Sequence, residues 1–327
     1  MTGLSDSFQR PINYLRISVT DRCNLRCVYC MPAGGVCLMP HADILSYEEI
    51  YKIAAAAAEL GVNKVRITGG EPLVRTGLPE LIRMLKRIDA IDDISLTTNG
   101  MLLERYAVEL KSVGLRRVNI SLDTLDLDKF ARITRGGNLS DALKGIEAAK
   151  AAGLNPVKIN VVVIPGVNDD ELPRFAAKTM NEGWNVRFIE RMPFSGEDAS
   201  ASQFIPVSEI REHLELLGEL EPYSVNIGNG PAKYYRLPGA NGTIGFITPV
   251  SEHFCFQCNR LRLTADGKLR LCLLNNEEMD LRAPLRKGIS TEELKKLIEK
   301  AIASKPLGHH LAEGDVKQDR PFSQVGG

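Results

Sequence analysis

The chain has 327 residues, of which 44% are hydrophobic and 25% are charged, enough for a sizeable core and more than one domain. Lysine plus arginine and aspartate plus glutamate each total 41, and this zero net charge argues against a protein that grips nucleic acid through a broad basic face. No run approaches the ~18–20 apolar residues of a membrane-spanning helix, and charged residues interrupt the N-terminal segment where a signal peptide would lie. We therefore expect a cytoplasmic protein with neither a membrane nor a nucleic acid polymer as its partner.

Apolar, β-branched runs alternate with helical patterns as far as residue 190. The runs predict strands at residues 15–19, 64–67, 94–97, 117–122, 157–164 and 186–189. The patterns between them predict helices at residues 46–60, 78–88, 103–113, 139–152 and 170–181. Strands that alternate with helices indicate an α/β fold with a parallel sheet and right-handed crossovers. Spacing alone leaves open whether this sheet is an open twisted one or most of a (β/α) barrel.

The pattern changes after about residue 200. A helix is expected at residues 208–217, and glycines and prolines then divide the chain into short strands and turns. We expect a hairpin around Asp266-Gly267, a final helix at 291–303 and an extended end at 320–327. These changes suggest a first domain at residues 1–220 and a smaller second domain at residues 221–327.

Most of the seven cysteines fall into two sets: Cys23, Cys27 and Cys30, directly after the first strand, and Cys255, Cys258 and Cys272. Each set is one thiolate short of a closed four-ligand site. A [4Fe–4S] cluster takes one thiolate per iron, so three cysteines leave one iron open to a small molecule. An odd cysteine count argues against a disulfide scaffold, and structural zinc usually takes four side chains. The sets therefore favour two [4Fe–4S] clusters, with zinc or disulfides as the alternatives; Cys37 and the loops at 34–37 and 195–201 receive no role.

The first set lies where a parallel α/β fold places its ligand site, in a loop beyond the carboxyl end of a strand. Its spacing, Cys23-x3-Cys27-x2-Cys30 with Tyr29 before the third cysteine, resembles the signature of the radical S-adenosylmethionine (SAM) superfamily. The segment Thr68-Gly69-Gly70-Glu71-Pro72, after the second strand, resembles the Gly-Gly-Glu-Pro motif of the same superfamily.

The resemblance implies that the open iron binds the amino and carboxylate groups of SAM. It also implies that further residues contact SAM: Tyr29 and Met192 at the adenine, Gly70 and Glu71 at the methionine amino group through backbone oxygens, and Ser121 at the ribose or carboxylate. Simple packing is the alternative for Tyr29 and Met192, and turn capping is the alternative for Ser121.

The second set of cysteines makes the resemblance more specific, to one family within the superfamily. Cys255-x2-Cys258-x13-Cys272 encloses Asn259-Arg260-Leu261-Arg262, and this pattern resembles the GTP 3′,8-cyclase family of molybdenum cofactor biosynthesis. Further similar motifs run nearly from end to end, at residues 10–12, 15–23, 96–103, 232–236 and 326–327. The resemblance implies an incomplete (β/α)6 barrel closed by a C-terminal iron–sulfur domain, and a second open iron that contacts the guanine of GTP.

The same resemblance implies a lyase. A 5′-deoxyadenosyl radical takes the ribose 3′ hydrogen of GTP, and the 3′ carbon then attacks guanine C8 to give (8S)-3′,8-cyclo-7,8-dihydroguanosine 5′-triphosphate. The implied protein partners are a reductant protein and a downstream cyclic pyranopterin monophosphate synthase. The oligomeric state, including a homodimer, stays open.

Several basic residues suit a triphosphate, which carries about four negative charges. The planar guanidinium of arginine fits the geometry of phosphate oxygens. Arg260 and Arg262 alternate along a predicted strand and so point to one face. Arg66 has apolar neighbours, and its burial is costly unless an anion or a structural ion pair balances it. By resemblance, GTP contacts Arg16, Arg66, Thr97, Lys158, Arg260, Leu261 and Arg262.

The last two residues, Gly326 and Gly327, would normally be read as a frayed end. The family instead inserts this tail into the active site, where it acts with Arg260 and Arg262. Val325 and Phe322 replace the usual isoleucine and methionine but keep apolar anchors. Other hypotheses are a two-cluster radical SAM enzyme that modifies a peptide, a second cluster that only stabilises its domain, and a metal-stabilised regulatory or RNA-binding module.

Overall fold

The computed structural model describes residues 3–192, 204–224, 230–309 and 319–326. Its centre is a run of six neighbouring parallel strands that follow the chain order. They are β1 (Tyr14–Ser18), β2 (Lys64–Thr68), β3 (Asp93–Thr98), β4 (Arg117–Ser121), β5 (Val157–Val163) and β6 (Asn185–Glu190). All six predicted strands are thus confirmed, with ends that differ by at most one residue.

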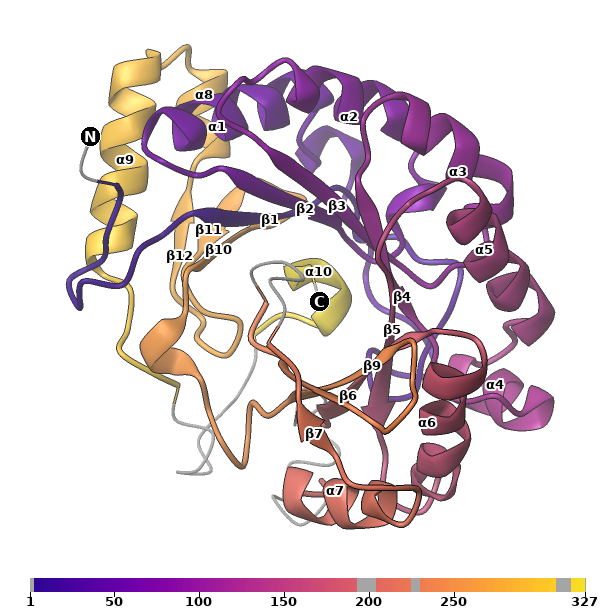
Figure 1. Ribbon diagram of the computed structural model, residues 1–327. Helices are drawn as coiled ribbons and strands as arrows, with labels where there is room; N and C mark the ends of the chain where they lie inside the picture. Colours follow the sequence, from indigo (N-terminus) through magenta and orange to yellow (C-terminus); the bar gives the residue numbers. More distant parts are fainter. Residues whose placement is uncertain (1–2, 193–203, 225–229, 310–318, 327) are drawn as a thin grey trace.

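Helices cover the outer face of this sheet (Figure 1). They are α1 (Tyr47–Glu59), α2 (Leu78–Lys86), α3 (Leu103–Ser112), α4 (Leu127–Thr134), α5 (Leu139–Ala151) and α6 (Leu172–Asn181). The Ser46 hydroxyl accepts a hydrogen bond from the Glu49 amide, and the Glu49 carboxylate accepts one from the Ser46 amide. This capping box begins α1. Helix α4 was not predicted, because it is short and shares one crossover with α5. No helix in the described part of the chain is long and apolar enough to cross a bilayer.

The C-terminal part adds strands to both edges of the sheet. On one side β10 (Arg260–Leu263) pairs in parallel with β1, and β11 (Lys268–Arg270) and β12 (Glu278–Asp280) follow in antiparallel order. On the other side β9 (Thr243–Ile247) pairs in parallel with β6, followed by β8 (Lys233–Arg236) and β7 (Glu221–Pro222). The predicted hairpin is therefore present as β10–β11. The boundary near residue 220 stays a prediction.

The sheet curves into an incomplete barrel with the helices outside (Figure 1), which decides between the two architectures that strand spacing left open. Helices α7 (Val207–Glu215), α8 (Arg282–Arg286) and α9 (Thr291–Ala303) complete the outer layer. The expected α/β class, with a parallel core sheet and a C-terminal part, is confirmed.

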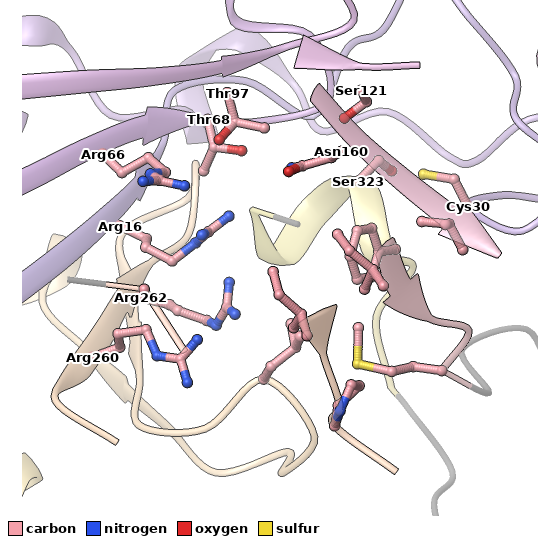
Figure 2. Close-up of a pocket in the computed structure, with 18 of the residues that line it drawn as sticks. Arg16, Cys30, Arg66, Thr68, Thr97, Ser121, Asn160, Arg260, Arg262 and Ser323 are labelled. Atoms are coloured by element: carbon pink, nitrogen blue, oxygen red, sulfur yellow. The ribbon is translucent and has the colours of Figure 1, made fainter. Parts of the chain in front are cut away.

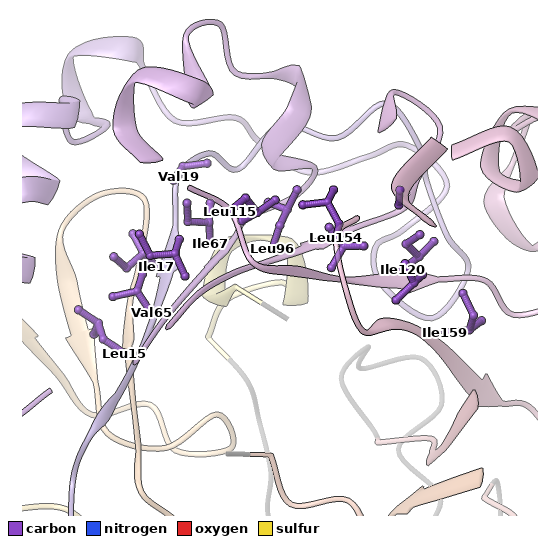
Figure 3. Close-up of a cluster of buried hydrophobic side chains, with 14 of the residues drawn as sticks. Leu15, Ile17, Val19, Val65, Ile67, Leu96, Leu115, Ile120, Leu154 and Ile159 are labelled. Atoms are coloured by element: carbon purple, nitrogen blue, oxygen red, sulfur yellow. The ribbon is translucent and has the colours of Figure 1, made fainter. Parts of the chain in front are cut away.

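The core lies between the sheet and the outer helices (Figure 3). Side chains that point outward from the strands are apolar and almost fully buried, among them Ile17, Ile67, Leu96, Ile120 and Ile159. Burying each such side chain stabilises the fold by about 1.5–3 kcal/mol. Because side chains alternate along a strand, the residues between them point into the barrel, and these are largely polar.

Strand register turns the inward residues into continuous rows. Arg16 of β1 lies beside Arg66 of β2, which lies beside Ser95 of β3. Two residues further along β3, Thr97 starts a second row that continues through Asn119 of β4 and Lys158 of β5. The fold thus separates an apolar outer face from a polar, mostly basic interior.

The end of the chain corrects one prediction. Residues 320–327 were expected to be extended, but Phe322–Val325 form a helical turn, α10, inside the barrel (Figure 1). Pro321 has the extended conformation of an N-cap, and Gly326 ends the turn with a left-handed φ of 73°. The Val325 side chain is completely buried, so packing against the barrel interior stabilises a turn that four residues could not form alone.

Candidate active site

Both cysteine sets open onto one pocket inside the barrel, a cavity of about 300 Å³. All of the cysteines that line it are free thiols: Cys23, Cys27, Cys30, Cys255, Cys258 and Cys272. The fold brings the two sets together because β10, which follows Cys258, pairs with β1, which precedes Cys23. Neither set forms a disulfide.

No group of three or more His, Cys, Asp or Glu side chains in the described ranges is arranged to hold a metal ion. Structural zinc gathers its ligands around one ion, whereas in a [4Fe–4S] cluster each thiolate binds a different iron. Each set supplies three free thiols, which is the donor number that leaves one iron of such a cluster open; a cluster at the second set stays a prediction.

The loop of the first set is fixed through its backbone. The amides of Cys30 and Met31 donate to the Cys27 carbonyl over 2.9 and 3.2 Å. Arg135, which ends α4 in a left-handed conformation, donates to the Met31 carbonyl over 2.8 Å. Helix α4, which the sequence did not predict, thus holds the cysteine loop in place.

The environment of the first set disfavours thiolates. Burial raises the pKa of Cys23 to about 11 and that of Cys30 to about 12. Burial, and then the Asp123 carboxylate, raises the pKa of Cys27 well above its usual range. These thiols must lose their protons when a metal cluster binds, so cluster binding supplies the energy for their ionisation.

The residues expected to contact SAM lie around this set: Tyr29, Gly70, Glu71, Ser121 and Met192 all line the pocket. The Tyr29 hydroxyl donates to the Asp123 carboxylate over 2.7 Å. Burial raises the pKa of that carboxyl to about 6. Asp123 was not singled out from the sequence, although it lies two residues after Ser121.

Glu71 and Gly70 hold neighbouring loops together. The Glu71 carboxylate accepts the Thr98 hydroxyl over 2.8 Å and the Asn99 amide over 2.7 Å, so it joins the ends of β2 and β3. Burial raises its pKa to about 7. At Gly70 a Cβ atom would lie 2.4 Å from the Arg22 carbonyl oxygen, so only glycine allows the cysteine loop to approach this closely.

The second set has a different electrostatic environment. Burial by itself would raise the pKa of Cys258, but Arg260 and then Lys305 lower it to about 6. Burial raises the pKa of Cys255. The amide of Cys258 donates to the Cys255 carbonyl over 3.0 Å, which closes the turn between these two cysteines.

Arginines line one side of the pocket. Figure 2 shows Arg16, Arg66, Arg260 and Arg262 on this side, with Cys30 and Ser121 on the other. Burial, followed by the neighbouring Arg260, lowers the pKa of Arg262 to about 10. Because these guanidinium groups repel one another, a bound polyanion would stabilise all of them together.

The tail already contacts two of these arginines. The Gly326 carbonyl accepts from Arg16 over 3.1 and 3.3 Å and from Arg262 over 3.1 Å. A Cβ at Gly326 would lie 3.0 Å from Thr68 Cγ2. The predicted contact of Gly327 lies outside the described residues.

Three residues predicted to contact GTP differ in their placement. Thr97 lines the pocket, whereas Lys158 is buried beneath it, with its Nζ 5.5 Å from the centre of the Tyr234 ring. Burial and then Arg187 lower the pKa of Lys158 to about 5. The Leu261 side chain packs in the outer core, and Leu261 does not line the pocket.

Sequence reasoning missed several polar residues of the interior. Among the described residues, buried atoms without a hydrogen-bond partner include the Tyr14 hydroxyl, Asn119 Oδ1, Asn160 Oδ1, and Nε and Nη2 of Arg187. Tyr14, Asn160 and Arg187 line the pocket. Arg187 lies inside a predicted strand, and strand alternation could have indicated that it faces the same interior as Lys158. The Tyr14 hydroxyl and the Arg187 guanidinium can donate to an anionic ligand, whereas the two amide oxygens can accept from N–H or O–H groups of a ligand.

The comparisons with known proteins agree with this geometry. Residues 17–178 match the model of the radical SAM superfamily, and residues 184–311 match the model described as Molybdenum Cofactor Synthesis C. The GTP 3′,8-cyclase of Pelotomaculum thermopropionicum is 55% identical over 326 residues, which cover 99% of this chain and 100% of that protein. The GTP 3′,8-cyclase of Moorella thermoacetica is 51% identical over 324 residues, with 99% and 100% covered.

A solved structure shares the fold. The crystal structure of Streptococcus suis SuiB bound to the precursor peptide SuiA has a TM-score of 0.64 and covers 90% of this chain and 65% of that chain. At 14% identity, this likeness shows the fold alone. The radical SAM match implies a [4Fe–4S] cluster and SAM as cofactors. The chain therefore belongs to the GTP 3′,8-cyclase family of radical SAM enzymes, as its motifs predicted.

Proposed function

We propose that this chain converts GTP into (8S)-3′,8-cyclo-7,8-dihydroguanosine 5′-triphosphate, the first step of molybdenum cofactor biosynthesis. The observation that carries the proposal is the shared pocket: two incomplete cysteine sets open onto it, and arginines line the wall beside the second set. One enclosed site can therefore hold a SAM molecule and a nucleotide close together, which radical transfer between them requires.

In this proposal Cys23, Cys27 and Cys30 hold the first cluster, whose open iron binds SAM. Tyr29, Ser121, Met192 and the backbone at Gly70 and Glu71 orient the cofactor. The Glu71 carboxylate contributes indirectly, since its hydrogen bonds are taken by Leu73, Thr98 and Asn99. It fixes the loop whose backbone oxygens would accept the methionine ammonium; the Glu71 carbonyl already accepts the Val74 amide over 3.2 Å and would use its second lone pair.

Cys255, Cys258 and Cys272 hold a second cluster, and its open iron binds the guanine of GTP. The side chains of Arg16, Arg66, Thr97, Lys158, Arg260 and Arg262, and the backbone of Leu261, bind the nucleotide. Arg16 and Arg262, which contact the tail, suit charge-assisted hydrogen bonds to an anion, and such bonds are stronger than neutral ones. Gly326 lies beside Arg16 and Arg262. Gly327, which lies outside the described residues, is assigned to the same tail by the resemblance.

When bound, the first cluster would supply the one electron that splits SAM into methionine and a 5′-deoxyadenosyl radical. That radical removes the 3′ hydrogen of GTP. Ring closure at C8 then requires one further electron and one proton to give the dihydro product. The reaction thus needs a reductant, which we assign to a separate protein, and a cyclic pyranopterin monophosphate synthase to consume the product. This chain contributes binding, orientation and the exclusion of water.

The test traces the 3′ hydrogen that GTP loses. The mass of the nucleotide alone cannot reveal the reaction, because the product and GTP are isomers of equal mass. The anaerobic protein is incubated with SAM, a strong reductant and GTP deuterated at C3′, and 5′-deoxyadenosine is then analysed by mass. The proposal expects deuterium in 5′-deoxyadenosine and a new nucleotide peak on chromatography. GTP deuterated at C2′ is the matched control. Unlabelled 5′-deoxyadenosine from the C3′-deuterated substrate would contradict the proposal.

A further inference from the structure

We propose that Lys305 is a positioning and charge-balancing residue of the second cluster. This inference rests on the proposed function, because it presupposes that Cys255, Cys258 and Cys272 bind such a cluster. Lys305 follows the end of α9 and lies behind the cysteine set rather than in the pocket.

The contacts of Lys305 join the two segments that carry the cysteines. The side chain is almost fully buried, with 3% of the residue exposed. Its Nζ donates to the carbonyl of Arg260, two residues after Cys258, over 3.0 Å. It also donates to the carbonyl of Leu271, the residue before Cys272. One ammonium group therefore fixes the spacing between Cys258 and Cys272.

A second buried cation lies behind the same set and provides a comparison. Arg10 donates to the Cys255 carbonyl over 2.7 Å and to the carbonyls of Pro306 and Leu307 over 2.6 and 2.8 Å. The Asp6 carboxylate lies 2.5 Å from Arg10 Nε, so the charge of Arg10 is balanced within the protein. Among the residues that the structure describes, no ion pair involves Lys305.

Burial of an ammonium without a counter-charge is costly, and two carbonyl oxygens offset only part of the cost. Three thiolates and a reduced iron–sulfur group would supply the missing negative charge. Cluster potentials depend on nearby charge, on hydrogen bonding and on exposure to solvent. A buried cation favours the reduced, more negative form, so we infer that Lys305 raises the reduction potential of the second cluster.

The experiment isolates the second cluster. In full-length protein with Cys23, Cys27 and Cys30 all changed to Ala, the midpoint potential is measured by a redox titration followed by electron paramagnetic resonance. Lys305→Met removes charge and hydrogen bonds, Lys305→Gln keeps a donor without charge, and Lys305→Arg keeps both. Lys300→Met, on the exposed side of α9, is the matched control.

We expect both neutral variants to lower the potential. At the midpoint of the unsubstituted protein, their ratio of reduced to oxidised cluster should fall at least tenfold, which is about 59 mV for one electron. Lys305→Arg and Lys300→Met should keep the potential. A Lys305→Gln protein with an unchanged potential would overturn the inference, because the charge of Lys305 would then have no influence on the potential of the cluster.

Folding and cluster content decide the remaining outcomes. A metal-free Lys305→Gln chain that does not fold, judged by circular dichroism, would show that Lys305 serves the fold and would also overturn the inference. If the background protein with Lys305 intact binds no iron at all, the proposed second cluster itself fails, and this inference fails with it. Iron content therefore distinguishes the two failures.

Discussion

The two cysteine sets have the same number of ligands and share one pocket, but their surroundings are opposite in charge. Around the first set burial dominates, and it raises the pKa of Cys23 to about 11 and that of Cys30 to about 12. At the second set, Arg260 and Lys305 outweigh burial at Cys258 and lower its pKa to about 6, whereas burial still raises the pKa of Cys255. Equal ligand sets therefore do not imply equal sites.

The difference follows from what surrounds each loop. The first loop lies beside the buried acids Glu71 and Asp123, whereas the second is connected to β10, which carries Arg260 and Arg262. SAM carries a net positive charge, because its sulfonium adds to a balanced ammonium and carboxylate, whereas a triphosphate is an anion that needs several cations. This contrast supports the proposal that the first set binds SAM and that the second set lies beside the nucleotide.

The largest expected effect separates the two sets. Cys27→Ala should abolish the reductive cleavage of SAM, because the first cluster loses a ligand and SAM loses its iron. Cys258→Ala should leave SAM cleavage measurable while GTP conversion is lost. Both variants are assayed for 5′-deoxyadenosine and for the cyclised nucleotide by liquid chromatography. Persistent 5′-deoxyadenosine formation by Cys27→Ala would contradict the assignment of the first set.

The second prediction concerns the arginine side of the pocket. Arg262→Ala removes a charge-assisted hydrogen bond worth ~1.5–3 kcal/mol, so GTP turnover at low substrate concentration should fall roughly 10- to 150-fold. SAM cleavage without GTP should be unaffected, because Arg262 lies on the opposite side from Cys30 (Figure 2). Arg282→Ala, which breaks an ion pair with Asp43 outside the pocket, is the control. Equal loss in both activities would show damage to the fold instead.

Sequence patterns predicted the parts of this molecule that depend on local chemistry. The central strands, the capping box at Ser46 and the cysteine spacings were all visible because each has a short-range signature. Helix α4 and the turn at Phe322–Val325 were not, since the first is short and the second forms only by packing inside the barrel. Lys305 was missed for a related reason: its partners, the carbonyls of Arg260 and Leu271, come from distant segments.

The third prediction tests, in the metal-free chain, the difference in thiol pKa between Cys258 and Cys23. At pH 7, Cys258 should be alkylated by iodoacetamide roughly 30- to 100-fold faster than Cys23, because its larger thiolate fraction outweighs its lower intrinsic nucleophilicity. Its rate should level off above about pH 7, since its pKa is about 6, whereas the rate at Cys23 should still rise at pH 9. The exposed Cys37 is first changed to Ser, and labelling is read by peptide mass analysis.

Arg260→Gln is the matched variant for this labelling experiment. Removal of the guanidinium should raise the pKa of Cys258 and slow its alkylation at pH 6, with little change at Cys23. Equal labelling rates at Cys23 and Cys258 in the unsubstituted chain would remove the electrostatic contrast between the two sets.

The smallest expected effect concerns the tail that lies between the sets. Gly326 has a left-handed φ of 73°, and an added Cβ would lie 3.0 Å from Thr68 Cγ2 and 3.2 Å from Ser18 Cβ. Gly326→Ala should therefore strain the tail by about 1–2 kcal/mol and reduce GTP conversion roughly 5- to 30-fold. Gly34→Ala, at an exposed position with open space, is the control and should have no effect. Because the Gly326 carbonyl contacts Arg16 and Arg262 but no cysteine of the first set, uncoupled SAM cleavage should persist in Gly326→Ala. Loss of that cleavage would show that the tail serves both sites equally.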